Sequence, residues 1–279
     1  MFINHNHVAP VNNAWGIRRG DPMFSTVERF VEILDRVGVE RAVVFPLYDY
    51  HIMTPSDCRE LNDWLSNKMK DYDHLVPFMT LDPKHSDAVP LAKEFAAKGF
   101  KGVKYHPPVF ETPINDPKNE RFYSACEALG LTILIHTGAH VSTPWPLRFY
   151  NPLLIDEVAM NHPGLKIIVE HLGGFDFIHE AVAVVKNNPK CFAGLTSFSG
   201  IPAGMLNHVF TTKCAGAFLN GSRPLLKDKL IFGTDFPNRE PQTEEMFEHE
   251  LCLSKELNLS QADLDNIFGG TLQRLLEEE

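Results

Sequence analysis

The sequence predicts an α/β protein, a single-domain (β/α)8 TIM barrel with a C-terminal helix. Three observations support this fold class. Eight short apolar segments recur along the 279 residues, each is followed by a segment with helical character, and no low-complexity linker divides the series. Short strands that are apolar on both faces and alternate with helices are typical of a closed parallel sheet surrounded by helices.

The first half of the chain contains four strand–helix pairs. Strands are predicted where apolar and β-branched residues run together, at residues 2–8, 41–46, 75–80 and 101–106. Helices are predicted at residues 25–37, 56–70, 86–98 and 119–129. Ser25 is the expected N-cap of the first helix, and Gly99 and Gly130 end the third and fourth. The segment around Pro10, Trp15 and Gly16 is predicted to be a loop.

The second half repeats this rhythm. Strands are predicted at residues 132–136, 166–170, 191–196 and 229–232, and helices at 152–161, 177–186, 203–217, 244–256 and 261–277. A doubly wound open sheet is the structural alternative. That fold normally has a glycine-rich phosphate turn after its first strand, and none is present there. The pair Gly173-Gly174 could bind a phosphate, but two adjacent glycines are weak evidence, so the barrel is favoured.

Composition narrows the class of protein. The chain is 44% hydrophobic and 22% charged, as in ordinary globular proteins, and its net charge of −10 argues against a nucleic-acid partner. Five scattered cysteines without a paired motif indicate reduced thiols, and no signal peptide or membrane span is apparent. We therefore expect a cytoplasmic protein that binds a small molecule and does not bind membranes. Homo-oligomerisation is left open.

Ionisable side chains gather at the predicted strand ends. In a barrel the active site lies at the carboxyl ends of the strands. The residues found there are His5, His7, Lys104, His106, His136, Glu170, His171 and Asp235. Alternation along the first strand would place His5 and His7 on one face, close enough to share an ion. A mixed histidine and carboxylate set suits Zn²⁺, Mn²⁺ or Fe²⁺.

Five motifs at these strand ends resemble the amidohydrolase-related branch of the amidohydrolase superfamily. They are HNH at residues 5–7, GVKYHP at 102–107, LIHTG at 134–138, EHLGG at 170–174 and FGTDFP at 232–237. The branch is similar to aminocarboxymuconate semialdehyde decarboxylase and γ-resorcylate decarboxylase, and it also contains lactonases and hydratases. The resemblance covers essentially the whole chain, and its motifs specify the superfamily far better than the reaction.

The resemblance implies roles for individual residues. It implies that one divalent ion is held by His5, His7, His136 and Asp235, and the ion we expect first is Zn²⁺, with Mn²⁺ and Fe²⁺ as alternatives. It makes His171 a catalytic acid/base, with Asp235 sharing the proton transfer. The chain departs from the family at Ile3, where an aspartate is common two residues before the first histidine.

Further residues are candidates for binding substrate. Lys104 and His106 share a strand face by the alternation rule, and Arg148 and Arg239 lie in loops where they could hold a carboxylate. The function predicted first is a metal-dependent hydrolase that cleaves a lactone, an amide or a related bond through a metal-activated water. Non-oxidative decarboxylation of a small aromatic or unsaturated acid is the alternative, and a non-catalytic metal- or ligand-binding barrel is the second alternative.

Overall fold

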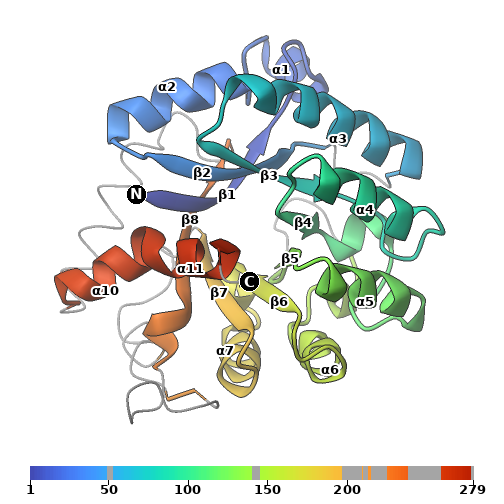
Figure 1. The fold of residues 1–279 in the computed structure, drawn as a ribbon, viewed down its shortest axis with the longest axis vertical. Coiled ribbons are helices and arrows are strands. Elements are labelled where there is room, and N and C mark those ends of the chain that lie inside the picture. Colours follow the sequence, from blue (N-terminus) through green and yellow to red (C-terminus); the bar gives the residue numbers. More distant parts are fainter. Residues whose placement is uncertain are drawn as a thin grey trace.

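The computed structural model describes residues 1–48, 53–139, 145–196, 209, 213–214, 225–237 and 259–277. Eight parallel strands close into one barrel in chain order, which confirms the predicted fold class (Figure 1). The strands are β1 (Phe2–Val8), β2 (Arg41–Pro46), β3 (Leu75–Thr80), β4 (Gly102–Tyr105), β5 (Thr132–His136), β6 (Lys166–Glu170), β7 (Cys191–Thr196) and β8 (Leu230–Phe236). Seven of these match the predicted bounds to within one residue, whereas β8 runs four residues beyond its predicted end.

Helices surround the strands in Figure 1. They are α1 (Ala14–Arg19), α2 (Val27–Val37), α3 (Pro55–Lys68), α4 (Ala88–Ala97), α5 (Glu120–Ala128), α6 (Leu153–Asn161), α7 (Ile178–Asn187), α10 (Gln261–Asp265) and α11 (Thr271–Glu277). Single turns include η2 (Pro107–Phe110), η4 (Leu147–Phe149) and η5 (His171–Gly173). The helix predicted at 261–277 is interrupted between α10 and α11 by the π-helical turn Asn266–Gly270. The helices predicted at 203–217 and 244–256 lie almost wholly outside the described residues.

Two local predictions near the amino terminus are wrong. The loop predicted after β1 contains the helix α1, which begins because the side chain of Asn13 accepts a hydrogen bond from the Gly16 amide. The N-cap of α2 is Thr26 and not Ser25. Ser25 has a φ of 62°, and its hydroxyl donates instead to the carbonyl of His7 at 2.7 Å. Ser25 therefore fixes the end of β1, where two of the predicted ligands lie.

The amino-terminal end of the barrel is closed by apolar packing. Phe2, at the start of β1, and Ile231, near the start of β8, belong to a buried cluster that includes Leu272 and Leu275 of α11. Figure 1 shows α11 lying across the strands beside β1 and β8. Burying apolar side chains on this scale supplies much of the stabilisation of a barrel. Among the described residues, this end is thus filled by an apolar cluster.

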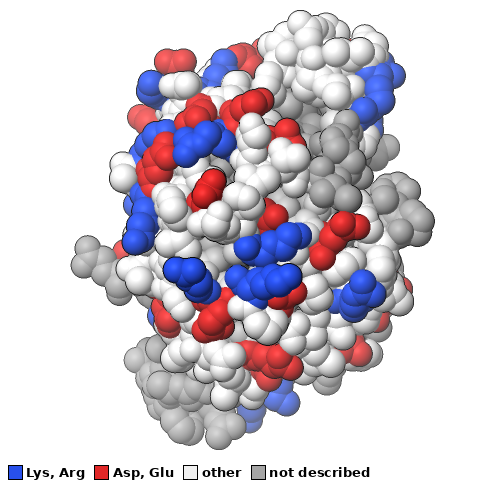
Figure 2. All heavy atoms as spheres, turned by 90° about the vertical axis from the view of Figure 1, so that its right-hand side faces the viewer, with Lys and Arg blue, Asp and Glu red and all other residues white. Residues whose placement is uncertain are grey.

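The outer surface is charged with both signs interspersed. Figure 2 shows this on the side of the barrel that lies at the right of Figure 1. On α3 and α4, Arg59 lies 3.1 Å from Glu94 and Lys98 lies 2.9 Å from Asp63. Such exposed pairs contribute little stability individually. Among the helices that the structure describes, none has the length and apolar character needed to cross a bilayer.

Candidate active site

Three donor atoms, on the buried His5 and His7 and the partly buried Asp235, converge at the carboxyl end of the barrel. The Nε2 atoms of His5 and His7 lie 3.2 Å apart. The Oδ1 atom of Asp235 lies 3.3 Å from the first of these nitrogens and 3.6 Å from the second. Ligand atoms about 2.1 Å from a tetrahedral ion lie roughly 3.4 Å from one another. The spacing of these three atoms therefore fits a divalent ion.

The protonation states also suit metal binding. Burial, followed by the nearby charge of Lys104, lowers the pKa of His5 well below its ordinary value, and burial lowers the pKa of His7. Burial alone would raise the pKa of Asp235, but the contacts with His7 and His5 outweigh it and lower that pKa. Near neutral pH the site thus presents two neutral imidazoles and a carboxylate, the ligand types that Zn²⁺, Mn²⁺ and Fe²⁺ accept.

Strand irregularities turn these side chains toward one another. Relative to β2, strand β1 has one extra residue between Ile3 and Asn6, and β8 has an extra residue opposite the same part of β1. His5 and Asp235 lie in these two bulges, with φ values of 59° and 58°. Such bulges redirect side chains next to active sites. The left-handed backbone at His5, and not strict alternation alone, brings its ring to face His7.

His171 lies close to this centre, and His136 is one ring further away. His5, His171 and Asp235 each offer a ligand atom, and these three atoms all lie within 4.8 Å of one another. The ring of His136 is centred 4.7 Å from that of His171 and 4.2 Å from that of His106. The predicted roles of His136 as ligand and His171 as acid/base stay predictions, because the donor spacing allows His171 to be a ligand as well.

Glu170 is a site residue whose role sequence reasoning missed. Its fully buried carboxylate lies 3.2 Å from Nδ1 of His5 and accepts hydrogen bonds from Asn4 and from the backbone amide of His171. A carboxylate this close to Nδ1 electrostatically favours the tautomer protonated there, which leaves the lone pair on Nε2 for a metal. Gly194 of β7 makes room for this carboxylate, since a Cβ at that position would lie 2.3 Å from Glu170 Oε1.

The predicted substrate-binding residues fall in different places. Lys104 is buried at the centre, with Nζ 3.2 Å from His5 Nε2, and burial lowers its pKa to about 8. His106 is buried beside His136. Arg148 is exposed, with its guanidinium 4.6 Å from the centre of the Phe149 ring. Arg239 lies outside the described residues. Within the described part of the chain, the structure thus brings Lys104 and His106 to the site.

Fold and site together define a (β/α)8 barrel with a candidate metal centre at its carboxyl end. The family model described as Amidohydrolase matches residues 34–277. The chain therefore belongs to the amidohydrolase family, which confirms the resemblance carried by the strand-end motifs. None of the curated proteins compared with the chain matches its sequence significantly.

Solved structures of similar fold include both decarboxylases and a hydrolase. The 5-carboxyvanillate decarboxylase of Sphingomonas paucimobilis is 13% identical, with a TM-score of 0.71, and the match covers 99% of this chain and 98% of that chain. A dihydroxybenzoic acid decarboxylase of Polaromonas with bound manganese is 15% identical, with a TM-score of 0.69 and coverages of 99% and 96%. A probable 2-pyrone-4,6-dicarboxylic acid hydrolase of Acinetobacter baumannii is 15% identical, with a TM-score of 0.67 and coverages of 99% and 98%. At these identities the likeness shows the fold.

Proposed function

We propose that the protein is a divalent-metal enzyme that acts on a carbonyl or carboxyl group of a small molecule. The observation that carries this proposal is the convergence of His5 Nε2, His7 Nε2 and Asp235 Oδ1 within 3.2–3.6 Å of one another. Two of these three atoms belong to buried histidines, where polar atoms need a compensating partner, and a cation would supply it. The manganese in the Polaromonas decarboxylase supports a divalent ion without fixing which one is used here.

The chain's own residues divide into three tasks. His5, His7 and Asp235 would hold the ion, with His136 as the fourth ligand that the family resemblance implies. The bound ion would polarise a substrate oxygen and lower the pKa of water. His171, within 4.8 Å of the donors on His5 and Asp235, would transfer a proton. Lys104, buried 3.2 Å from His5, would contact an anionic substrate oxygen.

Decarboxylation is the reaction we place first. Two of the three similar structures described above are decarboxylases of aromatic acids. In this reaction a substrate carboxylate leaves as CO₂, and the bond to carbon is replaced by a bond to a proton. His171 would deliver that proton, and Lys104 would hold the carboxylate before it leaves.

Hydrolysis is the second candidate, and the pyrone hydrolase among the similar structures supports it. Here a water would attack a lactone or amide carbonyl. Asp235 and His171 would take the proton of the water and return it to the leaving group. Both reactions use the same residues, so product analysis must separate them.

One experiment tests the proposal at two levels. Purified protein should contain about one divalent ion per chain by elemental analysis. His5→Asn should lose the ion, whereas His85→Asn, a change at an exposed histidine, should keep it. The metal-loaded protein is then given aromatic carboxylic acids, with CO₂ detection, and lactones and amides, with acid release followed at constant pH. A folded protein that is active without any metal would refute the ligand assignment, and a metal-loaded protein inert toward every class would favour the non-catalytic barrel.

A further inference from the structure

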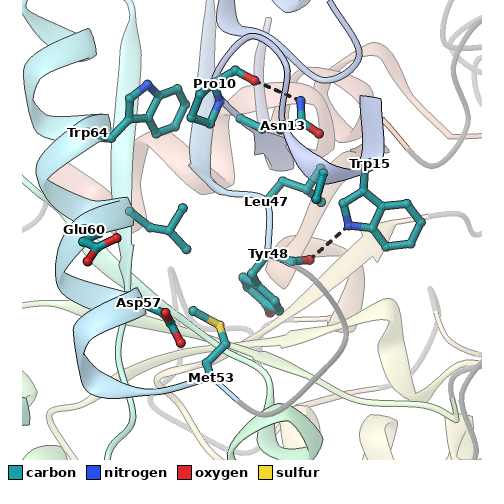
Figure 3. A pocket seen from close by; sticks show the side chains of 12 residues that line it. Pro10, Asn13, Trp15, Leu47, Tyr48, Met53, Asp57, Glu60 and Trp64 are labelled. Carbon is teal, nitrogen blue, oxygen red and sulfur yellow. Dashed lines mark hydrogen bonds between the residues drawn. The ribbon is translucent and has the colours of Figure 1, made fainter. Parts of the chain in front are cut away.

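A cavity of about 490 Å³ lies beside the candidate active site. It is bounded by the segment from β1 into α1, by the residues after β2 and by one face of α3, as Figure 3 shows. Its size falls in the range of small-molecule binding pockets. The lining residues used below are Trp15, Tyr48, Asp57, Glu60 and Trp64.

Tyr48 lies between this cavity and two histidines of the candidate site. The Tyr48 ring lines the cavity and is centred 6.3 Å from the ring of His7 and 6.2 Å from that of His106. The cavity therefore begins one side chain away from the site. A molecule with its reactive group at His5, His7 and Asp235 could extend its remaining part past Tyr48.

Three aromatic side chains form part of the cavity lining. Trp15 approaches it from α1, Trp64 from α3 and Tyr48 from the end of β2 (Figure 3). Apolar groups pack against such rings, and the ring faces also attract cations. Arg18 and Arg19 both lie over the Trp15 ring, at 4.7 Å and 5.6 Å, but neither lines the cavity.

Two carboxylates give the cavity lining a negative charge. Asp57 and Glu60, both labelled in Figure 3, are exposed residues one turn apart on α3, and both line the cavity. Asp57 Oδ2 caps the helix by accepting from the amide and hydroxyl of Thr54. Among the described residues, no lysine or arginine lines the cavity. Arg59, which lies between the two acids in the sequence, pairs with Glu94 on α4 instead.

We propose that this cavity binds the positively charged, apolar end of the substrate, an aliphatic or aromatic ammonium group. The ammonium would lie against the aromatic rings and near Asp57 and Glu60, while the carbonyl or carboxyl group reaches the histidine and aspartate donors. The inference rests on the proposed function for the identity of the reacting group. It adds that the substrate carries an amine remote from that group.

Binding of a simple probe tests this without requiring turnover. The full-length protein is titrated with 2-phenylethylammonium and with the neutral 2-phenylethanol, and binding is followed by calorimetry. The cation should bind roughly five- to tenfold more tightly than the alcohol, because only the cation gains from the ring faces and the carboxylates. Removing metal with a chelator should leave this preference unchanged, which separates the cavity from the metal centre.

Matched substitutions on α3 test whether the tighter binding of the cation depends on Glu60. Glu60→Gln should reduce it at least twofold, whereas Asp63→Asn, on the same helix but paired with Lys98, should leave it intact. Trp64→Leu should weaken the binding of both probes. Equal affinity for cation and alcohol, or equal effects of Glu60→Gln and Asp63→Asn, would overturn the proposal. A preserved preference in a protein that has no metal and no activity would uphold the cavity while refuting the proposed function.

Discussion

The two ends of this barrel are built on opposite principles. At the amino-terminal end, Phe2, Leu272 and Leu275 pack into an apolar cluster with side chains of the strands. At the carboxyl end, polar groups such as His5, Glu170 and Lys104 are buried just as deeply. Burying polar groups costs free energy unless they find partners, so the second end is stable only because its members compensate one another and, as we propose, an ion.

The backbone at the candidate site also departs from regular strand geometry. The β4–β5 pair keeps one register along its whole length, from Gly102 opposite Thr132 to Tyr105 opposite Ile135. His5, His171 and Asp235, by contrast, all have φ values between 58° and 62°. Such conformations cost about 1–3 kcal/mol each and persist where the surroundings enforce them. The apolar end therefore stabilises the fold, whereas the carboxyl end holds unfavourable backbone conformations that orient the side chains of the candidate site.

The largest expected effect distinguishes the proposed acid/base residue from the proposed metal ligands at the carboxyl end. His171→Asn should keep the fold and the metal but lower turnover by roughly 10²–10⁴-fold, the scale for removing a general acid or base. His136→Asn should lose metal and activity together, as the family resemblance implies. Metal content and rate are measured on both variants.

Loss of the metal from His171→Asn, and not from His136→Asn, would reverse these assignments. His171 offers a donor atom within 4.8 Å of those on His5 and Asp235. If His171→Asn removes the ion as completely as His5→Asn does, then His171 is a ligand and the acid/base role must be assigned to another residue. In that case His136→Asn should retain the metal.

The next effect tests the apolar end. Leu272 is fully buried under the barrel, and Leu272→Ala should lower the free energy of unfolding by about 2–5 kcal/mol. Leu129→Ala, at a position with 37% exposure, should have a much smaller effect. Denaturant unfolding measures both. Leu272 lies at the end of the barrel opposite the candidate ligands, so metal affinity should be unchanged in the folded Leu272→Ala protein. A parallel loss of affinity would show that the two ends are coupled through the shared apolar cluster, whose member Phe45 packs 4.6 Å from the ring of His7.

The sequence predicted the fold nearly completely because its signals were local. Residues 133–135 and 167–169, at the centres of two of these strands, are apolar without interruption, as buried parallel strands require. The errors came where a side chain acts at a distance. Ser25 looks like a helix cap, but its hydroxyl bonds the carbonyl of His7, a contact invisible until β1 and α2 are placed side by side.

The candidate site was predicted only in part. Strand-end positions identified His5, His7 and Asp235, which the structure brings together. The bulges that orient them could not be predicted, because an extra residue is defined only by the partner strand. The role of Glu170 was missed for a similar reason. Gly194 on β7 leaves space for the Glu170 carboxylate, and this relation can be recognised only when β6 and β7 are known to be paired.

Glu170 offers a smaller and sharper test of the carboxyl end. Glu170→Gln retains the shape but no longer places a charged acceptor at Nδ1 of His5, so metal affinity should fall by about 10–100-fold. Metal-binding titrations measure this, and thermal unfolding of the metal-free protein checks the fold. Glu32→Gln, at an exposed position on α2, is the control. Unchanged affinity in Glu170→Gln would show that His5 is oriented by its backbone alone.

The smallest expected effect concerns Asp263, which holds the segment leading into α11 at the apolar end. Its carboxylate accepts hydrogen bonds from Lys227 at 2.6 Å and from the hydroxyl of the N-cap Ser260 at 2.8 Å. Burial alone would raise its pKa, but these hydrogen bonds outweigh burial and hold the pKa below its ordinary value. Asp263 therefore stabilises the fold at pH values above about 4, and this contribution disappears as the pH falls through the lowered pKa.

Asp263→Asn should lower the free energy of unfolding by about 1 kcal/mol at pH 7 and by progressively less in acid, as measured by unfolding at several pH values. Asp265→Asn on the same helix should cost less, and a cost for Asp263→Asn that is independent of pH would show that the cap, and not the charge, secures this end.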